Sequence, residues 1–249
     1  MILIVSFLMF FTNFANLTLG EEASFEKIPV RIIKEIILPK AYHEGLYLDG
    51  KNIWVSNGRG YDTWVFDTET GKIISKIKPI GSFTEAISSA GDGTFWMTDW
   101  NEKKLYRVKI EEGRMEAVDS VSLELARPAG VVWTGEYLYL ITWTRGAGGT
   151  SYHLLQFDSA GKILRKMRIK HIPEPAHLAW DDKNLWITSW YNQRVYKIDE
   201  KTFQVLDSFQ SPAAKTTGIA WDGRHFWITG THANLYQTAV GEFDESHVV

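Results

Sequence analysis

Three titratable residues occupy a repeated position at which small or apolar side chains would be ordinary. Glu44, Glu85 and His177 each stand at the start of a short β-type segment that recurs along the chain. If these segments are the innermost strands of a ring, the three side chains point towards a partly enclosed channel. Burial there raises the pKa of a carboxyl group and suits it to general acid and base work. The alternatives are a solvated or hydrogen-bonded structural carboxylate and a structural histidine.

Tryptophan is the unusual feature of the composition, with 11 copies in 249 residues. Two repeated sets are expected in the core. The set in mid-strand contains Trp54, Trp96, Trp186 and Trp227. The set directly before a hairpin contains Trp133, Trp180 and Trp221. A further set follows four residues after the mid-strand aromatic, where the strand leaves its sheet: Trp100, Trp143 and Trp190. We predict that this last set forms an aromatic wall on a binding face. Ordinary loop packing is the alternative.

The sequence lacks the residue patterns that several kinds of catalytic and metal site require. It has no cysteine, its seven histidines form no His-x-x-x-His pair, and it has neither an Asp-rich calcium loop nor a Gly-x-Ser-x-Gly elbow. The glycine-rich run at residues 146–149 lacks the Lys-Ser/Thr of a phosphate loop and predicts a flexible insertion. The formal net charge of -3 argues against a polyanionic partner. We therefore predict no metal site and no nucleic-acid partner.

The elements that must position these residues come from an internal repeat. Its central aromatic recurs at Trp54, Trp96, Tyr139, Trp186 and Trp227, in steps of 42, 43, 47 and 41 residues. Each unit contains short β segments separated by turn residues, and no helical periodicity is sustained. Units of this length are typical of the blades of a β-propeller. The sequence predicts an all-β protein with five blades.

The fifth unit ends after its third strand, at residues 235–240. The segment before the first unit, residues 30–38, resembles the outer strands of the other units. We predict that this N-terminal strand completes the last blade, which closes the ring and leaves no unpaired edge at the seam. The domain then spans residues 30–240.

The two ends of the chain are predicted to lie outside the propeller domain. Residues 1–20 carry no charge and include an apolar run followed by small residues at 18 and 20, as in a secretory signal peptide. An uncleaved N-terminal membrane anchor is the alternative. Residues 21–29 are expected to be a linker and residues 241–249 a C-terminal tail. The predicted location is secreted or periplasmic.

The second unit carries a resemblance to a known family. It reads Ser-Phe-Thr-Glu-Ala over residues 82–86 and then Phe-Trp-Met-Thr-Asp-Trp over residues 95–100. Together with five units and N-terminal closure, this resembles the plant and bacterial type of glutaminyl-peptide cyclotransferase over about residues 30–240. The resemblance implies that Glu85 is catalytic and that Phe83, Trp100 and Trp190 line the site.

The sequence departs from the family pattern in blades one, three and four. Glu44 stands where the family has glutamine, Ala129 where it has tryptophan, and residues 176–179 read Ala-His-Leu-Ala in place of Asn-Glu-Leu-Glu. Glu44, Trp143 and His177 remain candidate substrate-binding residues from their positions alone.

The implied reaction converts the N-terminal glutamine of a peptide to pyroglutamate with release of ammonia, and it requires no cofactor. One alternative is a secreted, non-catalytic propeller that binds a peptide, glycan or protein on the tryptophan-lined face. Another is a metal-assisted lyase or lactonase, a class that resembles seven- and six-bladed rings.

Overall fold

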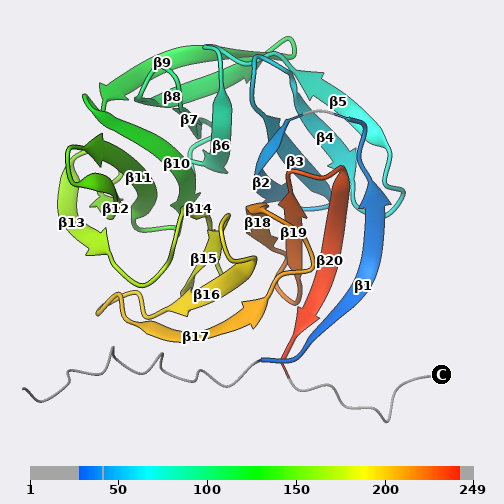
Figure 1. Cartoon of the computed structure of the whole chain (residues 1–249). Coiled ribbons are helices and arrows are strands. Elements are labelled where there is room, and N and C mark those ends of the chain that lie inside the picture. Colours follow the sequence, from blue (N-terminus) through cyan, green and yellow to red (C-terminus); the bar gives the residue numbers. More distant parts are fainter. Residues whose placement is uncertain (1–27, 41, 242–249) are drawn as a thin grey trace, which may run out of the picture.

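A computed structural model describes residues 28–40 and 42–241. Within them the chain forms 20 β-strands and no helix, arranged as five four-stranded antiparallel sheets around a central axis (Figure 1). The prediction of an all-β, five-bladed propeller is confirmed. The predicted signal peptide or anchor at residues 1–20 lies outside the described residues, as do residues 21–27 and 242–249. In the described ranges, no helix is long and apolar enough to cross a membrane.

Each blade runs from an inner strand at the axis to an outer strand at the rim. The first blade contains β2 (His43–Asp49), β3 (Asn52–Asn57), β4 (Thr63–Asp67) and β5 (Ile73–Ile77). The second contains β6 (Thr84–Ser89), β7 (Phe95–Asp99), β8 (Lys104–Glu111) and β9 (Arg114–Ser122). The third contains β10 (Ala126–Trp133), β11 (Leu138–Gly146), β12 (Gly149–Phe157) and β13 (Ile163–Ile169).

The remaining blades follow the same order, and the chain ends at the seam. The fourth contains β14 (Pro175–Trp180), β15 (Leu185–Ser189), β16 (Arg194–Ile198) and β17 (Val205–Gln210). The fifth contains β18 (Thr216–Trp221), β19 (Phe226–Gly230), β20 (Asn234–Val240) and, as its outer strand, β1 (Val30–Ile37). The inner strands β2, β6, β10, β14 and β18 lie next to one another around the axis.

The cores lie between neighbouring blades, because each sheet packs against the preceding blade on one face and the following blade on the other. The predicted mid-strand core tryptophans are all buried: Trp54, Trp96, Trp186 and Trp227. Trp227 of blade five packs in one cluster with Ile53 and Phe66 of blade one. The Trp186 ring of blade four meets Phe226 of blade five, with ring centroids 4.9 Å apart. The repeated aromatics therefore join adjacent blades, as expected for a propeller.

The predicted closure of the ring is confirmed. Strand β1 pairs antiparallel with β20, from Val30 opposite Val240 to Ile37 opposite Asn234. The amide of Gly241 donates to the carbonyl of Pro29, with 3.1 Å between nitrogen and oxygen. Both ends of the described chain therefore meet beside the same blade.

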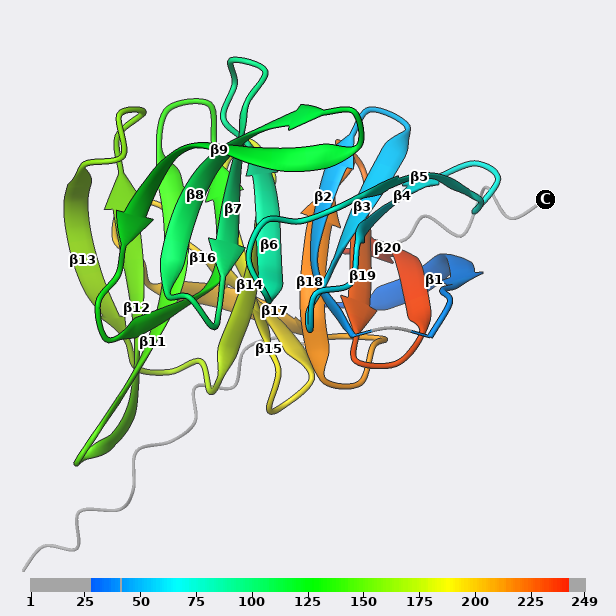
Figure 2. The same ribbon diagram turned by 90° about the horizontal axis from the view of Figure 1, so that it is seen from above.

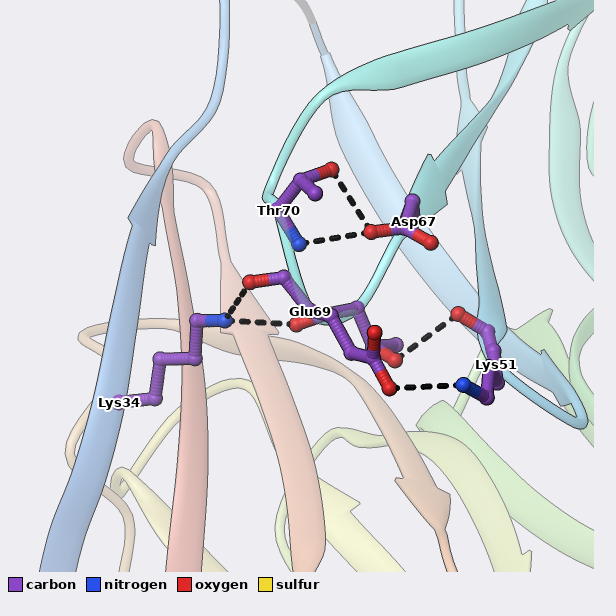
Figure 3. A network of polar contacts seen from close by, with 6 residues as sticks. Lys34, Lys51, Asp67, Glu69 and Thr70 are labelled. Carbon is purple, nitrogen blue, oxygen red and sulfur yellow. Dashed lines mark hydrogen bonds and ion pairs between the residues drawn. The ribbon is translucent and has the colours of Figure 1, made fainter.

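Strand β1 is also tied to the neighbouring first blade (Figure 3). The Lys34 ammonium donates to the carbonyls of Thr68 at 2.7 Å and Glu69 at 2.6 Å. Glu69 in turn pairs with Lys51 at 2.8 Å. Because these groups are largely exposed, each contact adds little stability. Their effect is to fix the outer strand of blade five against the turn between β4 and β5.

Residues 146–149, predicted to be a flexible insertion, form the tip of a long paired hairpin in blade three. Strands β11 and β12 stay in register from Leu138 opposite Phe157 to Gly146 opposite Gly149. Figure 2 shows this hairpin projecting beyond one end of the ring. Gly149 has a φ of +100°, which glycine adopts without strain. The glycines therefore form a tight turn that lengthens a regular hairpin.

Candidate active site at one mouth of the channel

Antiparallel pairing brings the candidate residues to one end of the ring. The first residue of an inner strand lies opposite the last residue of the second strand, as in the pairs Thr84 with Asp99 and Pro175 with Ser189. The starts of β2, β6 and β14 therefore share one channel mouth with the ends of β7, β11 and β15. The structure places the candidates around this mouth: Glu44, Glu85, His177, Trp100, Trp143 and Trp190.

A β-bulge at the start of every inner strand aims these side chains. The register between inner and second strands slips at the same place in all five blades. The slips fall around Glu44, Glu85 and His177 in blades one, two and four. A bulge leaves a residue unpaired and turns its side chain away from the regular pleat. The bulge is thus a property of the repeat, while the type of side chain at the bulge differs from blade to blade.

Glu85 is half-buried at the mouth of the channel. Burial, followed by repulsion from the nearby Asp99 carboxylate, raises the pKa of Glu85 to about 8. Asp99 has no exposed surface and is held by the backbone amides of Ser82 and Phe83, each 2.8 Å from its Oδ2. The Glu85 carboxyl makes no hydrogen bond to another described residue. At neutral pH it is therefore a protonated acid whose oxygens are free to meet a ligand.

Glu44 is the second carboxyl group of this mouth, and only 7% of its surface is exposed. Burial raises the pKa of Glu44 well above its ordinary value, repulsion by Glu85 raises it further, and the Arg59 guanidinium lowers it in part. Arg59 itself stacks on Tyr42, with its Cζ 4.2 Å from the ring centroid. Two neighbouring carboxyl groups that both resist ionisation are suited to accepting and returning a proton.

The His177 side chain of blade four reaches across the channel to Gly45 of blade one. It is 1% exposed, and neither ring nitrogen has a hydrogen-bond partner among the described residues. A Cβ atom on Gly45 would lie only 2.5 Å from its Nε2 and 2.7 Å from the carbonyl oxygen of Glu85. Glycine at position 45 is therefore what lets the imidazole approach the start of β6.

Burial also sets the charge of this histidine. It lowers the pKa of His177 to about 4, and the backbone of Ile219 and Leu178 opposes that shift only in part. The imidazole is neutral at physiological pH and adds no positive charge to the channel.

The predicted aromatic wall is divided into two parts. Trp100 and Trp143 pack edge to face, with ring centroids 5.3 Å apart. Both line a cavity of about 570 Å³ between blades two and three. Trp190 does not line that cavity; its ring lies under the Lys215 ammonium, with 4.5 Å from Nζ to the ring centroid. The three residues share a channel mouth and do not form one continuous surface.

Phe83 lies between blades one and two. Its ring sits over Gly58, where an added Cβ atom would be only 2.4 Å from the ring, and it meets Tyr42 edge to face at 5.7 Å. Its backbone amide holds Asp99, and its carbonyl accepts a hydrogen bond from the Trp100 amide at 3.1 Å. Phe83 thus connects the carboxyl groups of the channel to the first tryptophan of the cavity.

The sequence analysis missed Asp99 and Arg59, which shape the charge of the site. Asp99 had a detectable signal, because the equivalent last position of the second strand is Asn57 in blade one, Ser189 in blade four and Gly230 in blade five. An acid at that register, beside Glu85, stands out from the repeat. Arg59 lies after the second strand of blade one and acts on Glu44 only through the tertiary structure.

The expectation that Trp133, Trp180 and Trp221 belong to the core is only partly met. They are half-buried and line a second cavity of about 340 Å³ at the opposite end of the channel. The inner strands end there, so one face of each indole remains open to that cavity.

In the part of the chain that the structure describes, no three His, Asp or Glu side chains are grouped so that they could hold a metal ion.

No protein-family model matches the sequence, and no curated protein matches it significantly. Among solved structures, a glutaminyl cyclase from Myxococcus xanthus is 18% identical, with a TM-score of 0.69, covering 88% of this chain and 99% of the other. A PQQ-bound aldose sugar dehydrogenase from Streptomyces coelicolor is 11% identical, with a TM-score of 0.58, covering 86% and 98%.

A virginiamycin B lyase from Staphylococcus aureus is 12% identical, with a TM-score of 0.51, covering 86% of this chain and 99% of that one. The three named proteins perform different reactions. At such low identity the likeness shows a shared fold. By structure, therefore, this chain is a β-propeller that resembles a bacterial glutaminyl cyclase among others.

Proposed function

We propose that this protein cyclises the N-terminal glutamine of peptides to pyroglutamate, with Glu85 as the proton shuttle. The observation that carries the proposal is the half-buried Glu85 carboxyl at the channel mouth, whose pKa is raised to about 8 by burial and by Asp99. A carboxyl group with a pKa near the working pH both accepts and donates a proton efficiently. Likeness to a solved glutaminyl cyclase agrees with this choice among propeller functions.

In the proposed reaction the α-amine nitrogen attacks the side-chain amide carbon of the same glutamine. A carbon–nitrogen bond forms within a new five-membered ring, and the bond from that carbon to the amide nitrogen breaks. The proton lost by the amine passes through Glu85 to the leaving nitrogen, which departs as ammonia. The step consumes no water, oxidant or cofactor, so the protein contributes orientation and proton transfer.

The test is an assay of ammonia and pyroglutamate from a neutral dipeptide that begins with glutamine. We expect turnover by the wild type and a loss of about 100-fold or more for Glu85→Gln, the usual contribution of a positioned acid or base. This substitution keeps the shape of the side chain and removes its titratable proton.

Glu44→Gln is the matched control, since it makes the same chemical change at the neighbouring carboxyl group. We expect its activity to survive or improve. Wild-type turnover no faster than the spontaneous reaction would refute the cyclase proposal. Full activity of Glu85→Gln would refute the assignment of Glu85 and make Glu44 the next candidate.

The cavity beside Trp100 and Trp143 favours a second candidate, a non-catalytic propeller that binds a ligand on this face. Paired aromatic rings in a concave site bind ligands without requiring any reaction. This candidate predicts saturable peptide or glycan binding with no ammonia release, so the same assay separates the two. Because residues 1–20 resemble a signal peptide, we propose that either function is exercised in a secreted or periplasmic setting.

A further inference from the structure

The cavity between blades two and three is lined by positive charge. Its lining contains three cationic side chains and no carboxylate: Trp100, Asn101, Lys103, Leu125, Arg127, Trp143, Arg145 and Thr150. We call this cavity the cationic cleft. Such a local concentration of positive charge attracts and orients an anionic group.

The cations of the cleft have no anionic partner among the residues that the structure describes. None of the ion pairs formed by residues 28–40 and 42–241 includes Lys103, Arg127 or Arg145. Arg127 is fixed in place, because its Nη1 donates to the Trp100 carbonyl at 3.1 Å and its Cζ lies 5.4 Å from the centroid of the Trp100 ring. The remaining N–H groups of that guanidinium are suited to a bidentate contact with a carboxylate.

The aromatic walls of the cleft are rigid. The Trp143 indole donates to the carbonyl of Pro175 in blade four at 2.7 Å, and its ring also meets Tyr152 edge to face at 4.9 Å. A cleft whose walls are already ordered loses little conformational entropy when a ligand enters.

The long hairpin of blade three supplies one side of the cleft. Trp143 and Arg145 lie on β11, and Thr150 lies opposite Arg145 on β12. This hairpin belongs to the repeat with the longest step, and it projects from the ring in Figure 2. The additional length of blade three therefore contributes one wall of the cleft.

The cleft adjoins the mouth that contains Glu85. Trp100 follows Asp99 directly, and its amide is bonded to Phe83, two residues before Glu85. Because an extended chain advances about 3.3–3.6 Å per residue, a peptide with its first residue in the mouth can carry its following residues towards the cleft.

We propose that the cationic cleft binds carboxylate side chains at the positions that follow the N-terminal residue of a peptide ligand, so that acidic peptides are the preferred class. The proposal specifies the substrate class for the proposed cyclase and rests on that function for the position of the first residue. A small, aromatic-walled cavity with three cations suits one or two carboxylates of a peptide better than a long polyanion.

The test compares peptides that differ only in charge. Gln-Glu-Glu-Phe-amide and Gln-Gln-Gln-Phe-amide have nearly the same shape, and the same pair beginning with alanine cannot cyclise. Affinities are measured by calorimetry at low and at physiological salt. We expect the wild type to bind the Glu-Glu peptides about tenfold more tightly at low salt, with the advantage reduced by added salt.

Arg145→Gln is the informative variant, because Arg145 is exposed on the hairpin and its loss is not expected to disturb the core. We expect it to reduce the charge preference by about threefold, and the double variant with Lys103→Gln to remove most of it. Arg168→Gln is the matched control: it makes the same change at an exposed position of β13 in the same blade and should leave the preference intact.

Three results would overturn the proposal. The first is equal binding of the Glu-Glu and Gln-Gln peptides by the wild type, and the second is a charge preference that Arg145→Gln does not alter. The third is tighter binding of a heparin-derived oligosaccharide that depends on Arg145, which would assign the cleft to a sulfated glycan. A preference for acidic peptides without turnover would refute the cyclase proposal and support the proposed role of the cleft. Turnover without a charge preference would support the cyclase proposal and refute the role of the cleft.

Discussion

The imidazole of His177 shows how a single buried group makes stability depend on pH. Its pKa is lowered from 6.5 to about 4 by burial in the channel. Between these pH values the unfolded chain binds a proton that the folded protein excludes. The stability that this residue provides above pH 6.5 is therefore lost as the pH falls towards 4.

We expect His177→Asn to remove the part of the pH dependence of stability that comes from this histidine. Between neutral pH and pH 4 the free energy of unfolding of the wild type should fall by about 2 to 3 kcal/mol more than that of the variant. Urea unfolding at a series of pH values measures the difference. His171→Asn is the control, because that side chain is solvent-exposed, and it should follow the wild type. Parallel curves for the wild type and His177→Asn would show that the histidine does not resist protonation.

At the scale of the element, strand β1 decides whether the ring closes. Ile36 is 6% exposed and packs in the cluster shared by blades five and one, whereas its neighbour Ile37 is 70% exposed. The alternation puts one side chain into the core and the other into solvent, as expected for a strand with one covered face. The adjacent positions form a matched pair for testing how much the closing strand contributes.

We expect Ile36→Ala to lower the free energy of unfolding by about 2 to 4 kcal/mol, through lost burial and a residual cavity. Ile37→Ala should cost less than about 1 kcal/mol, since only strand propensity is lost. Urea denaturation of both variants gives the comparison. If the two substitutions cost the same, β1 does not close the ring through its buried face.

At the scale of the whole molecule, both ends of the described chain meet at one blade, where Gly241 is bonded to Pro29. The ring should therefore tolerate a new opening elsewhere. We expect a circular permutant that joins residue 241 to residue 29 by a short linker and opens between Ala147 and Gly148 to fold. Its stability should lie within about 2 kcal/mol of the parent, because the tip is exposed and the β11–β12 pairing replaces the former seam.

The control permutant opens between Met97 and Thr98, which are fully buried in β7. It should not give a cooperative unfolding transition, because the break removes ladder hydrogen bonds and core packing together. Circular dichroism and thermal unfolding distinguish the two permutants. A well-folded control would mean that single blades, rather than the closed ring, are the units of stability.

The fold could be derived from the sequence because its signals are local and repeated. The five aromatic markers, the turn residues and the missing last strand of the fifth unit define blade number and closure without knowledge of any contact. The same repeat predicted that Glu85, Glu44 and His177 share one register, since equivalent positions in a ring face one axis. The turn at residues 146–149 was misjudged because glycines indicate a bend without specifying whether the flanking strands remain paired.

The chemistry of the site was decided by the tertiary structure. The raised pKa of Glu85 depends on burial and on Asp99, and that of Glu44 depends on burial and on Glu85, with Arg59 opposing the shift. The close approach of the His177 ring to β2 depends on the glycine at position 45. The cationic cleft likewise exists only where the turn after β7 meets β10 and the β11–β12 hairpin. A strand pattern depends on neighbours along the chain, whereas a pKa or a cleft depends on distances between residues that only ring closure brings together.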